Sequence, residues 1–168
     1  MGPERRKILG IDPGLGGALA FLDAGGDLEV FDMPVHRLTR SGKAKREVDS
    51  YELARIVDTH GPVSHAFVEQ VGAMPGQGVT SMFQFGRSLG IVEGVLSAGF
   101  IPIDYVTPRK WRSGLGVRAG KDGSRARASA LMPGHAELWT RVKDDGRAEA
   151  ALIALYGQRQ RRSDGSRM

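Results

Sequence analysis

Apolar residues in the first fifth of the chain form three short runs. Residues 7–11 predict a buried strand that ends at a turn over 12–14, where a proline and a glycine interrupt the run. Residues 17–22 and 28–33 form the other two runs, and the segment between them contains the glycines that suit a hairpin turn. We therefore expect three antiparallel strands at the start of the chain.

The remaining pattern alternates between helical and extended segments. A helix is predicted at about 49–59, a strand at 64–68, a helix at 81–98, a strand at 100–106, a short helix that begins after Thr107 and Pro108, and helices at 124–132 and 145–158. Thr107 is a suitable N-cap and Pro108 a suitable first-turn residue. This order predicts an α/β fold with a mixed sheet.

Two basic segments lack apolar periodicity. Residues 36–46 are expected to be a solvated loop, whose basic stretch 37–46 has no assigned role, and residues 158–168 a disordered tail. The helix at 81–98 has another unusual feature, three glycines at four-residue spacing: Gly86, Gly90 and Gly94. Each interior glycine costs about 1 kcal/mol relative to alanine. The stripe therefore indicates that another backbone, from the sheet or from a partner subunit, packs closely there.

Composition narrows the class of protein. The chain has 168 residues, 40% of them hydrophobic, which suits a single domain over 1–157. It has no cysteine, which excludes disulfides and thiolate metal sites. No apolar run approaches the roughly 20 residues of a membrane span and no apolar stretch follows the charged start, so we expect a cytoplasmic protein without membrane contact. The net charge of +5 favours an anionic partner such as nucleic acid.

Acidic residues stand where the predicted elements end or begin. Asp12 and Glu69 each close a strand, and if those strands are neighbours both carboxylates emerge at one sheet edge. Asp145 and Glu149 are four residues apart on the last helix and can face the same edge. Gathered carboxylates repel one another unless divalent cations neutralise them, and oxygen ligands suit Mg²⁺ or Mn²⁺. Two such ions about 4 Å apart can promote phosphodiester hydrolysis.

Each of these acids also has a structural interpretation. Asp12 could only shape its turn, because aspartate is common before proline and glycine. Asp144 and Asp145 could be helix caps and Glu149 an ordinary acid of the first turn. The matching positions of Asp12 and Glu69 at two strand ends favour a functional role.

Three segments together resemble the acidic motifs of the RuvC-type resolvases, which are nucleases of the RNase H fold. They are 8–14 with Asp12, 67–70 with Glu69, and 145–150 with Asp145 and Glu149. The resemblance covers roughly residues 7–157. It implies a mixed five-stranded sheet, with its first three strands antiparallel, flanked by helices.

For function, the resemblance implies a nuclease that cuts Holliday junctions or other branched DNA. It implies two Mg²⁺ ions, which Mn²⁺ can replace, and four metal ligands: Asp12, Glu69, Asp145 and Glu149. It also implies a homodimer, since a junction offers two symmetric strands to cut, and we expect the helix at 81–98 at its interface. A light-scattering mass of a monomer at micromolar concentration would contradict that interface.

The segment after residue 107 resembles the basic stretch with which these enzymes hold DNA phosphate. Lys121 would then act in catalysis by countering charge on the transferring phosphate. The expected DNA-binding residues are Arg109, Lys110, Arg112, Arg118 and Lys121. All could be ordinary surface residues, but their clustering favours phosphate contact. Trp111 and Trp139 have apolar neighbours and are interpreted as packing anchors.

The sequence departs from the RuvC pattern at three positions. The last acid is usually aspartate, where this chain has Glu149, and the third acid is best matched by Asp145 with Asp144 as the alternative. Gly72 stands where resolvases tend to carry an aromatic residue that stacks on the junction. Three residues could replace that aromatic: Met74, Phe83 and Phe85.

Other functions remain open. One alternative is a nuclease of the same fold that acts on another nucleic acid, such as a YqgF-like ribosomal RNA processing enzyme or a flap nuclease. Another is a junction-binding protein without catalysis, against which the full set of acids argues. ATP binding of the sugar-kinase or actin type also begins with a strand, an aspartate and a glycine turn. It needs a second phosphate loop and a much longer chain, and is the least favoured.

Overall fold

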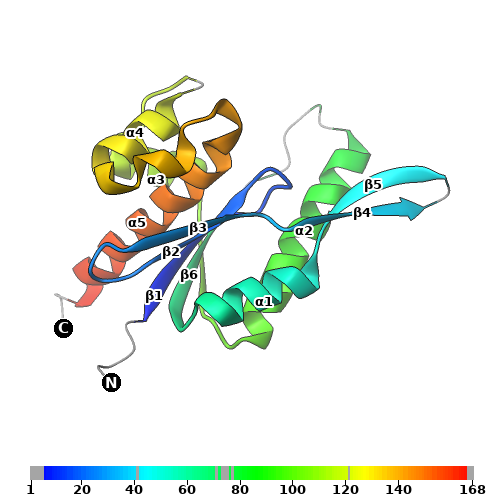
Figure 1. Ribbon diagram of the computed structural model, residues 1–168, viewed down its shortest axis with the longest axis horizontal. Helices are drawn as coiled ribbons and strands as arrows, with labels where there is room; N and C mark the ends of the chain where they lie inside the picture. The colour runs from blue at the N-terminus through cyan, green and yellow to red at the C-terminus, as the bar shows by residue number, and fades with distance from the viewer. Residues whose placement is uncertain are drawn as a thin grey trace.

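A mixed five-stranded sheet forms the centre of the protein. The computed structural model describes residues 6–40, 42–70, 72, 76, 78–120 and 122–165. The strand order is β3-β2-β1-β6-β7 (Figure 1). The strands are β1 (Lys7–Asp12), β2 (Ala18–Leu22), β3 (Leu28–Asp32), β6 (Val63–Glu69) and β7 (Ile103–Val106). The first three are antiparallel and β6 and β7 run parallel to β1, which confirms the predicted mixed sheet.

The register between β1 and β6 positions the candidate site. Ile11 of β1 lies opposite Val68 of β6 in a parallel pair, so Asp12 and Glu69 take the next position on each strand. Neighbouring strands are about 4.8 Å apart. The two acids therefore stand side by side at the same end of the sheet, as the sequence predicts.

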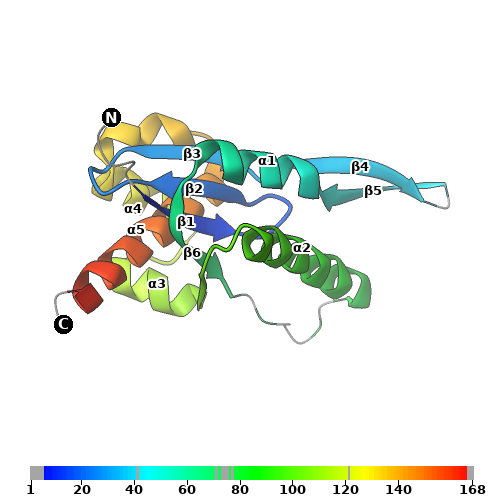
Figure 2. The ribbon, with the colours of Figure 1, turned by 90° about the horizontal axis from the view of Figure 1, so that it is seen from below.

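Helices cover both faces of the sheet (Figures 1 and 2). One apolar core lies between the sheet and the two helices α1 (Ser50–His60) and α2 (Val79–Ala98). The other core lies under α3 (Pro108–Leu115), α4 (Gly123–Leu131), the 3-10 helix η1 (Pro133–Trp139) and α5 (Asp145–Gly165). A second 3-10 helix, η2 (Val142–Asp144), leads into α5. None of the helices in the described ranges combines the length and apolar character that crossing a membrane requires.

Helix α5 packs directly against the central strand. A Cβ atom at Gly10 would lie only 2.9 Å from Cα of Ala154 and would overlap the backbone of Ala150. The α5 residues that face the sheet include fully buried alanines at 148, 150, 151 and 154. This close approach brings the first turn of α5, with Asp145 and Glu149, to the end of the sheet where β1 and β6 finish.

Helix α2 buries a different face from the one that its glycines occupy. Val92, Leu96 and Ser88 are buried, whereas Met82 is 40% exposed. Met82 lies in the first turns of α2, before the part of the helix that packs on the sheet. A Cβ atom built at Gly86, Gly90 or Gly94 would have no described atom within 4 Å. The sheet of the same chain therefore does not cover the stripe.

The predicted loop at 36–46 is wrong, because this segment forms a two-stranded ribbon. Strands β4 (Val35–Arg40) and β5 (Lys43–Val48) pair antiparallel and extend away from the body of the protein (Figure 1). Val48 is buried at the base of the ribbon. Beyond it most residues of both strands are polar, with Leu38 and Ala44 as isolated apolar residues, so no regular alternation of apolar and polar residues marked them as strands.

The predicted disordered tail is also wrong over most of its length. Helix α5 continues through Gly165, so it includes residues 158–165. Gln158 donates a hydrogen bond from Nε2 to the carbonyl of Asp23 at 2.7 Å, and Arg162 donates one to the carbonyl of Ala24 at 3.1 Å. These contacts with the β2–β3 turn fasten a polar helix end, which periodicity alone does not indicate. Residues 166–168 lie outside the described residues.

Candidate active site

Asp12 lies at the end of β1 and is held by its own turn. Its Oδ1 accepts a hydrogen bond from the backbone N–H of Gly14 at 3.1 Å. A Cβ atom at Gly17 would lie 2.8 Å from Cγ of Asp12, because the turn folds back over the carboxylate. Burial raises the pKa of Asp12 to about 6, the Gly14 N–H opposes this rise, and the negative charge of Glu149 adds to it.

Glu69 lies beside Asp12 at the end of β6 and is 7% exposed. Its Oε1 accepts a hydrogen bond at 2.9 Å from the indole N–H of Trp111, a fully buried residue of α3. Burial, together with the smaller effects of the negative charges of Asp12 and Glu149, raises the pKa of Glu69 to about 7. The Trp111 N–H and the charge of Arg112 act in the opposite direction.

Trp111 therefore does more than the packing that the sequence predicted for it. Its ring is buried as expected, yet its N–H orients the carboxylate of Glu69. A signal was available in the chain, because a buried tryptophan normally finds a hydrogen-bond acceptor. The sequence does not identify that acceptor, which is 42 residues away.

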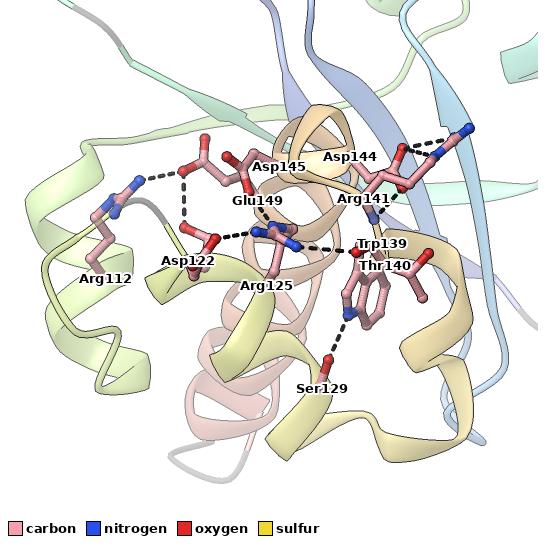
Figure 3. A network of polar contacts seen from close by, with 11 residues as sticks. Arg112, Asp122, Arg125, Ser129, Trp139, Thr140, Arg141, Asp144, Asp145 and Glu149 are labelled. Atoms are coloured by element: carbon pink, nitrogen blue, oxygen red, sulfur yellow. Dashed lines mark hydrogen bonds and ion pairs between the residues drawn. The ribbon is translucent and has the colours of Figure 1, made fainter.

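Glu149, one turn into α5, is balanced by groups from α3 and α4. Its Oε1 accepts a hydrogen bond from Oγ of Ser124 at 3.0 Å and forms an ion pair with Arg112 (Figure 3). The guanidinium of Arg112 also lies over the ring of Trp111, 4.9 Å from its centroid. Arg112, predicted to bind DNA, is thus placed among the acids. Sequence reasoning gave Ser124 no role in the site.

Asp145 shares its side of α5 with Glu149 and is balanced in a similar way. Nε of Arg125, on α4, donates to Oδ1 of Asp145 at 2.7 Å. The same guanidinium pairs with Asp122 and donates to the carbonyl of Thr140 at 3.3 Å. Arg125 thereby ties the start of α5 to α4 (Figure 3).

Asp144, the alternative third acid, is used differently. It is buried, and both of its oxygens accept hydrogen bonds from the Arg141 side chain. Its Oδ2 also accepts the backbone N–H of Arg141 at 3.0 Å, which forms a capping box over η2. The Arg141 guanidinium holds the pKa of Asp144 below its usual value. Figure 3 shows Asp144 and Arg141 apart from Glu149 and Arg112.

Three other predicted DNA-binding residues lie outside this cluster of acids. Arg109 and Lys110 are exposed on the first turn of α3, and Arg118 is exposed after that helix. Thr107 caps α3 as predicted, by accepting the backbone N–H of Lys110 at 3.3 Å. Lys121, the predicted catalytic lysine, lies outside the described residues, and so does Met74.

The donor set of the cluster fits a divalent cation, but its present arrangement is not a finished metal site. Asp12 and Glu69 are neighbouring acids whose pKa values are raised first by burial and then by nearby negative charge. Oxygens of Asp145 and Glu149 are instead occupied by guanidinium groups. No three His, Asp or Glu side chains in the described part of the chain are close enough to hold an ion as they stand. Carboxylates from all three elements could hold Mg²⁺ or Mn²⁺ if the arginines give way.

Comparisons with known proteins agree with this architecture. No protein-family model matches the chain. A Holliday junction resolvase of Chlamydomonas reinhardtii, the chloroplastic protein MOC1, is 33% identical over an alignment of 153 residues. That alignment covers 76% of this chain and only 17% of the relative.

Solved structures match over most of the chain. Thermus thermophilus RuvC in complex with a Holliday junction substrate has a TM-score of 0.60 and 12% identity, covering 92% of this chain and 96% of that one. The yeast mitochondrial Holliday junction resolvase Ydc2 has a TM-score of 0.59 and 16% identity, covering 92% and 78%. The chain therefore has the RuvC-type, RNase H-like fold and is related in sequence to a Holliday junction resolvase.

Proposed function

We propose that this protein is a metal-dependent endonuclease that cuts branched DNA, above all four-way Holliday junctions. The observation that carries the proposal is the meeting of acids from β1, β6 and α5 at one end of the sheet, where the charge of Glu149 contributes to raising the pKa values of both Asp12 and Glu69. The Chlamydomonas relative is named a Holliday junction resolvase, and the Thermus protein was solved with a junction substrate. Both support the same substrate class for this chain.

In this proposal, two Mg²⁺ ions, or Mn²⁺ in their place, are held by Asp12, Glu69, Asp145 and Glu149. Bound divalent cations activate a water molecule and stabilise the leaving 3′ oxygen of the phosphodiester. The capping role of Asp144 favours Asp145 as the third ligand.

Residues around the acids orient them for this task. Trp111 fixes the Glu69 carboxylate through its N–H, and Ser124 fixes that of Glu149 through its hydroxyl. Such outer hydrogen bonds set the orientation and basicity of metal ligands. Arg112 and Arg125 neutralise the helix acids until ions bind, and a released guanidinium can then contact a DNA phosphate.

DNA phosphates are bound in this proposal by the basic residues around α3. Arg109, Lys110 and Arg118 are exposed there, and Arg112 and Lys121 complete the predicted set. Lys121 keeps its proposed catalytic role of countering charge on the phosphate. Neutralised phosphates release counterions, so the affinity for DNA should fall steeply as salt rises.

The protein should act as a homodimer through α2. The glycine stripe of α2 is open in the described structure, and its first turns expose Val79 at 85%, Met82 at 40% and Phe83 at 70%. Such an apolar surface beside a flat stripe suits a second copy of the helix. Light scattering at micromolar concentration should give the mass of a dimer, and the mass of a monomer would contradict this part of the proposal.

Gly72 stands where resolvases tend to carry an aromatic residue, so stacking at the branch point requires another side chain of this chain. Phe83 is exposed on the first turns of α2, whereas Phe85 is half-buried. Because Phe83 belongs to the surface proposed for the dimer contact, Phe85 is the one of the two that remains to contact DNA. A cytoplasmic location is also part of the proposal, and fractionation of cells that express the tagged chain would test it.

The experiment that tests the proposal compares three substrates. A mobile four-way junction, a flap and a structured RNA are each incubated with the protein and Mg²⁺ or Mn²⁺, beside an Asp12→Asn control. We expect paired nicks in the junction that require the metal and Asp12. Faster cutting of the flap or the RNA would favour the alternative nucleases, and junction binding without metal-dependent cleavage would favour a non-catalytic binder.

A further inference from the structure

A pocket of about 520 Å³ lies between the β4–β5 ribbon, α2 and the turn that follows Asp12. Its volume is within the range of about 300–1,000 Å³ that small-molecule sites occupy. The ribbon, the turn and α2 contribute these lining residues: Leu15, Lys45, Arg46, Thr80, Ser81, Gln84, Phe85 and Ser88. Leu15 is three residues beyond Asp12, so the pocket adjoins the candidate active site.

One polar group at this pocket lacks a partner. Nε2 of Gln84 is shielded from solvent and has no hydrogen-bond acceptor within the described ranges. Its neighbour Ser88 does not supply one, since the Ser88 hydroxyl donates to the backbone carbonyl of Gln84. A buried amide donor without an acceptor is unfavourable. Gln84 is thus prepared to donate to a ligand that brings a carbonyl oxygen or a ring nitrogen.

The ribbon presents positive charge without compensation. Arg37 and Arg46 lie directly opposite each other on β4 and β5, so their side chains share one face of the ribbon. Both are exposed, and neither pairs with an acid in the part of the chain that the structure describes. Like charges in directly opposed positions destabilise a strand pair. An anion such as a phosphate would remove that repulsion.

The ribbon is nevertheless held in a defined position. Glu47, next to Arg46, forms an ion pair with Arg87 of α2. β5 packs beside α2, and Val48 anchors the base of the ribbon in the core. The two arginines are therefore presented on a positioned element beside the pocket rather than on a loose loop.

The remaining lining suits a flat aromatic ring. Leu15 and Phe85 provide half-buried apolar surface, and the hydroxyls of Thr80 and Ser81 add groups that both donate and accept hydrogen bonds. Aromatic and apolar side chains that hold a base by stacking are a common basis for recognising unpaired nucleotides. Apolar walls, one free amide donor and adjacent arginines match a nucleobase joined to a phosphate.

We propose that this pocket holds one unpaired nucleobase of the DNA strand near the cleavage site, while Arg37 and Arg46 bind the backbone phosphate beside it. The inference rests on the proposed nuclease function and adds a specificity site to it. A base that is unpaired, or easily unpaired at a branch point, enters such a pocket more readily than a base within a duplex. The contact of Gln84 with the base edge would then select the sequence at which the enzyme cuts.

The test places 2-aminopurine, a fluorescent base, at each branch-point position of a four-way junction and measures binding without divalent cations. We expect fluorescence to change at one position with the wild-type protein. Phe85→Ala should abolish that change and weaken binding by roughly 5- to 100-fold, the effect of losing one stacked base. Arg37→Gln and Arg46→Gln should each reduce the salt dependence of binding by about one counterion.

The control is Arg161→Gln, which removes an exposed arginine from the far end of α5 and should change neither readout. Gln84→Leu should keep DNA affinity within about threefold of the wild type and change the sequence preference of cleavage, as expected of a single base-edge contact. Circular dichroism checks that each variant is folded, and the exposed arginine variants do not depend on core packing.

The outcomes separate this inference from the proposed function. If the wild type cuts junctions with Mg²⁺ while the pocket variants behave like Arg161→Gln, the pocket inference is wrong and the nuclease proposal stands. If the wild type cuts nothing yet shows the position-specific fluorescence change, the nuclease proposal fails and the pocket stands. No fluorescence change at any position overturns the pocket.

Discussion

Asp12 and Glu69, at the ends of β1 and β6, differ from Asp145 and Glu149, on α5, in how their negative charge is balanced. The strand acids lie close together and make no ion pair within the described part of the molecule. Burial raises their pKa values to about 6 and about 7, together with the charge of Glu149 at both acids and that of Asp12 at Glu69. The helix acids are more exposed, at 40% and 19% of their side-chain surface, and each pairs with an arginine.

This difference indicates how the site would receive cations. The strand acids stand on the central strands of the sheet, so their positions are fixed, and they lack positive charge that a divalent cation would supply. The helix acids already have positive partners on α3 and α4. Ion binding at the strand acids is therefore favoured at once, whereas binding at the helix acids requires Arg112 and Arg125 to move. Under the proposed function, Asp12 and Glu69 would define the place of cleavage, and Asp145 and Glu149 with their arginines would respond to metal and DNA.

The largest effect on cleavage is expected when one of the strand acids, Asp12 or Glu69, is replaced. Glu69→Gln keeps the acceptor for Trp111 but removes the negative charge. We expect single-turnover cleavage of a four-way junction to fall by more than about 100-fold, beyond the usual range for groups that only support metal ligands. Junction affinity measured without metal should change little. Cleavage at the wild-type rate would show that Glu69 is not part of the site.

The second effect concerns stability without metal. A folded-state pKa of about 6 for Asp12 means that the folded protein binds this proton more tightly than the unfolded chain does. Protonated Asp12 therefore contributes stability to the metal-free protein below about pH 4, and this contribution is lost as pH rises through 6. Asp12→Asn removes this loss, and we expect it to raise the free energy of unfolding at pH 8 by up to about 3 kcal/mol relative to pH 4.

Thermal unfolding in a chelator at the two pH values measures this effect. Asp58→Asn, a change of an exposed acid on α1, is the matched control; it retains Asp12 and should therefore lose stability with rising pH as the wild type does. An Asp12→Asn protein that is less stable than the wild type at pH 8 would contradict the charge imbalance of the strand acids.

The third prediction concerns the hydrogen bond from Trp111 of α3 to Glu69. Trp111→Phe retains a buried ring but loses the N–H that binds Glu69, and we expect cleavage to fall by about 10- to 100-fold. Trp139→Phe is the control, because the Trp139 N–H donates at 3.0 Å to Ser129, away from the acids. Equal losses in both variants would mean that general packing, rather than the contact with Glu69, sets the rate.

The smallest effect is expected at the helix acids, which pair with arginines. Arg112→Gln leaves Glu149 without its cation, so the affinity for Mn²⁺ measured without DNA should rise by about two- to fivefold, equivalent to an ion pair of about 0.5–1 kcal/mol. Arg141→Gln, which frees Asp144 instead, should leave Mn²⁺ affinity unchanged. A rise in Arg141→Gln alone would make Asp144 the ligand and Asp145 the structural acid.

The positions of Asp12 and Glu69 were predictable from the sequence. The surroundings of Asp145 and Glu149, which pair with arginines, were predictable only in part. Apolar runs that end in an acid and a turn are local signals, and they placed Asp12 and Glu69 at matching strand ends. The partners of the acids are not local, since Trp111 reaches Glu69 across 42 residues and Arg112 reaches Glu149 across 37. Arg112 was predicted as a surface contact because its charge, and not its position, is visible in the sequence.

The errors in the predicted fold have the same origin. The β4–β5 ribbon has polar side chains on both faces, so it lacks the alternation that reveals a half-buried strand. The last turns of α5 are polar and depend on contacts with a turn more than 130 residues earlier in the chain. Both elements are specified by tertiary contacts that no local pattern contains.

The most direct test of the central claim is a calorimetric titration of the protein with Mn²⁺ in the absence of DNA. The account predicts that the wild type binds the ion and releases protons as it does so at pH 6.5, because Asp12 and Glu69 must lose theirs. It also predicts that the double variant Asp12→Asn, Glu69→Gln shows neither binding nor proton release. Equal Mn²⁺ binding by the wild type and the double variant would contradict the claim that these acids form the metal site.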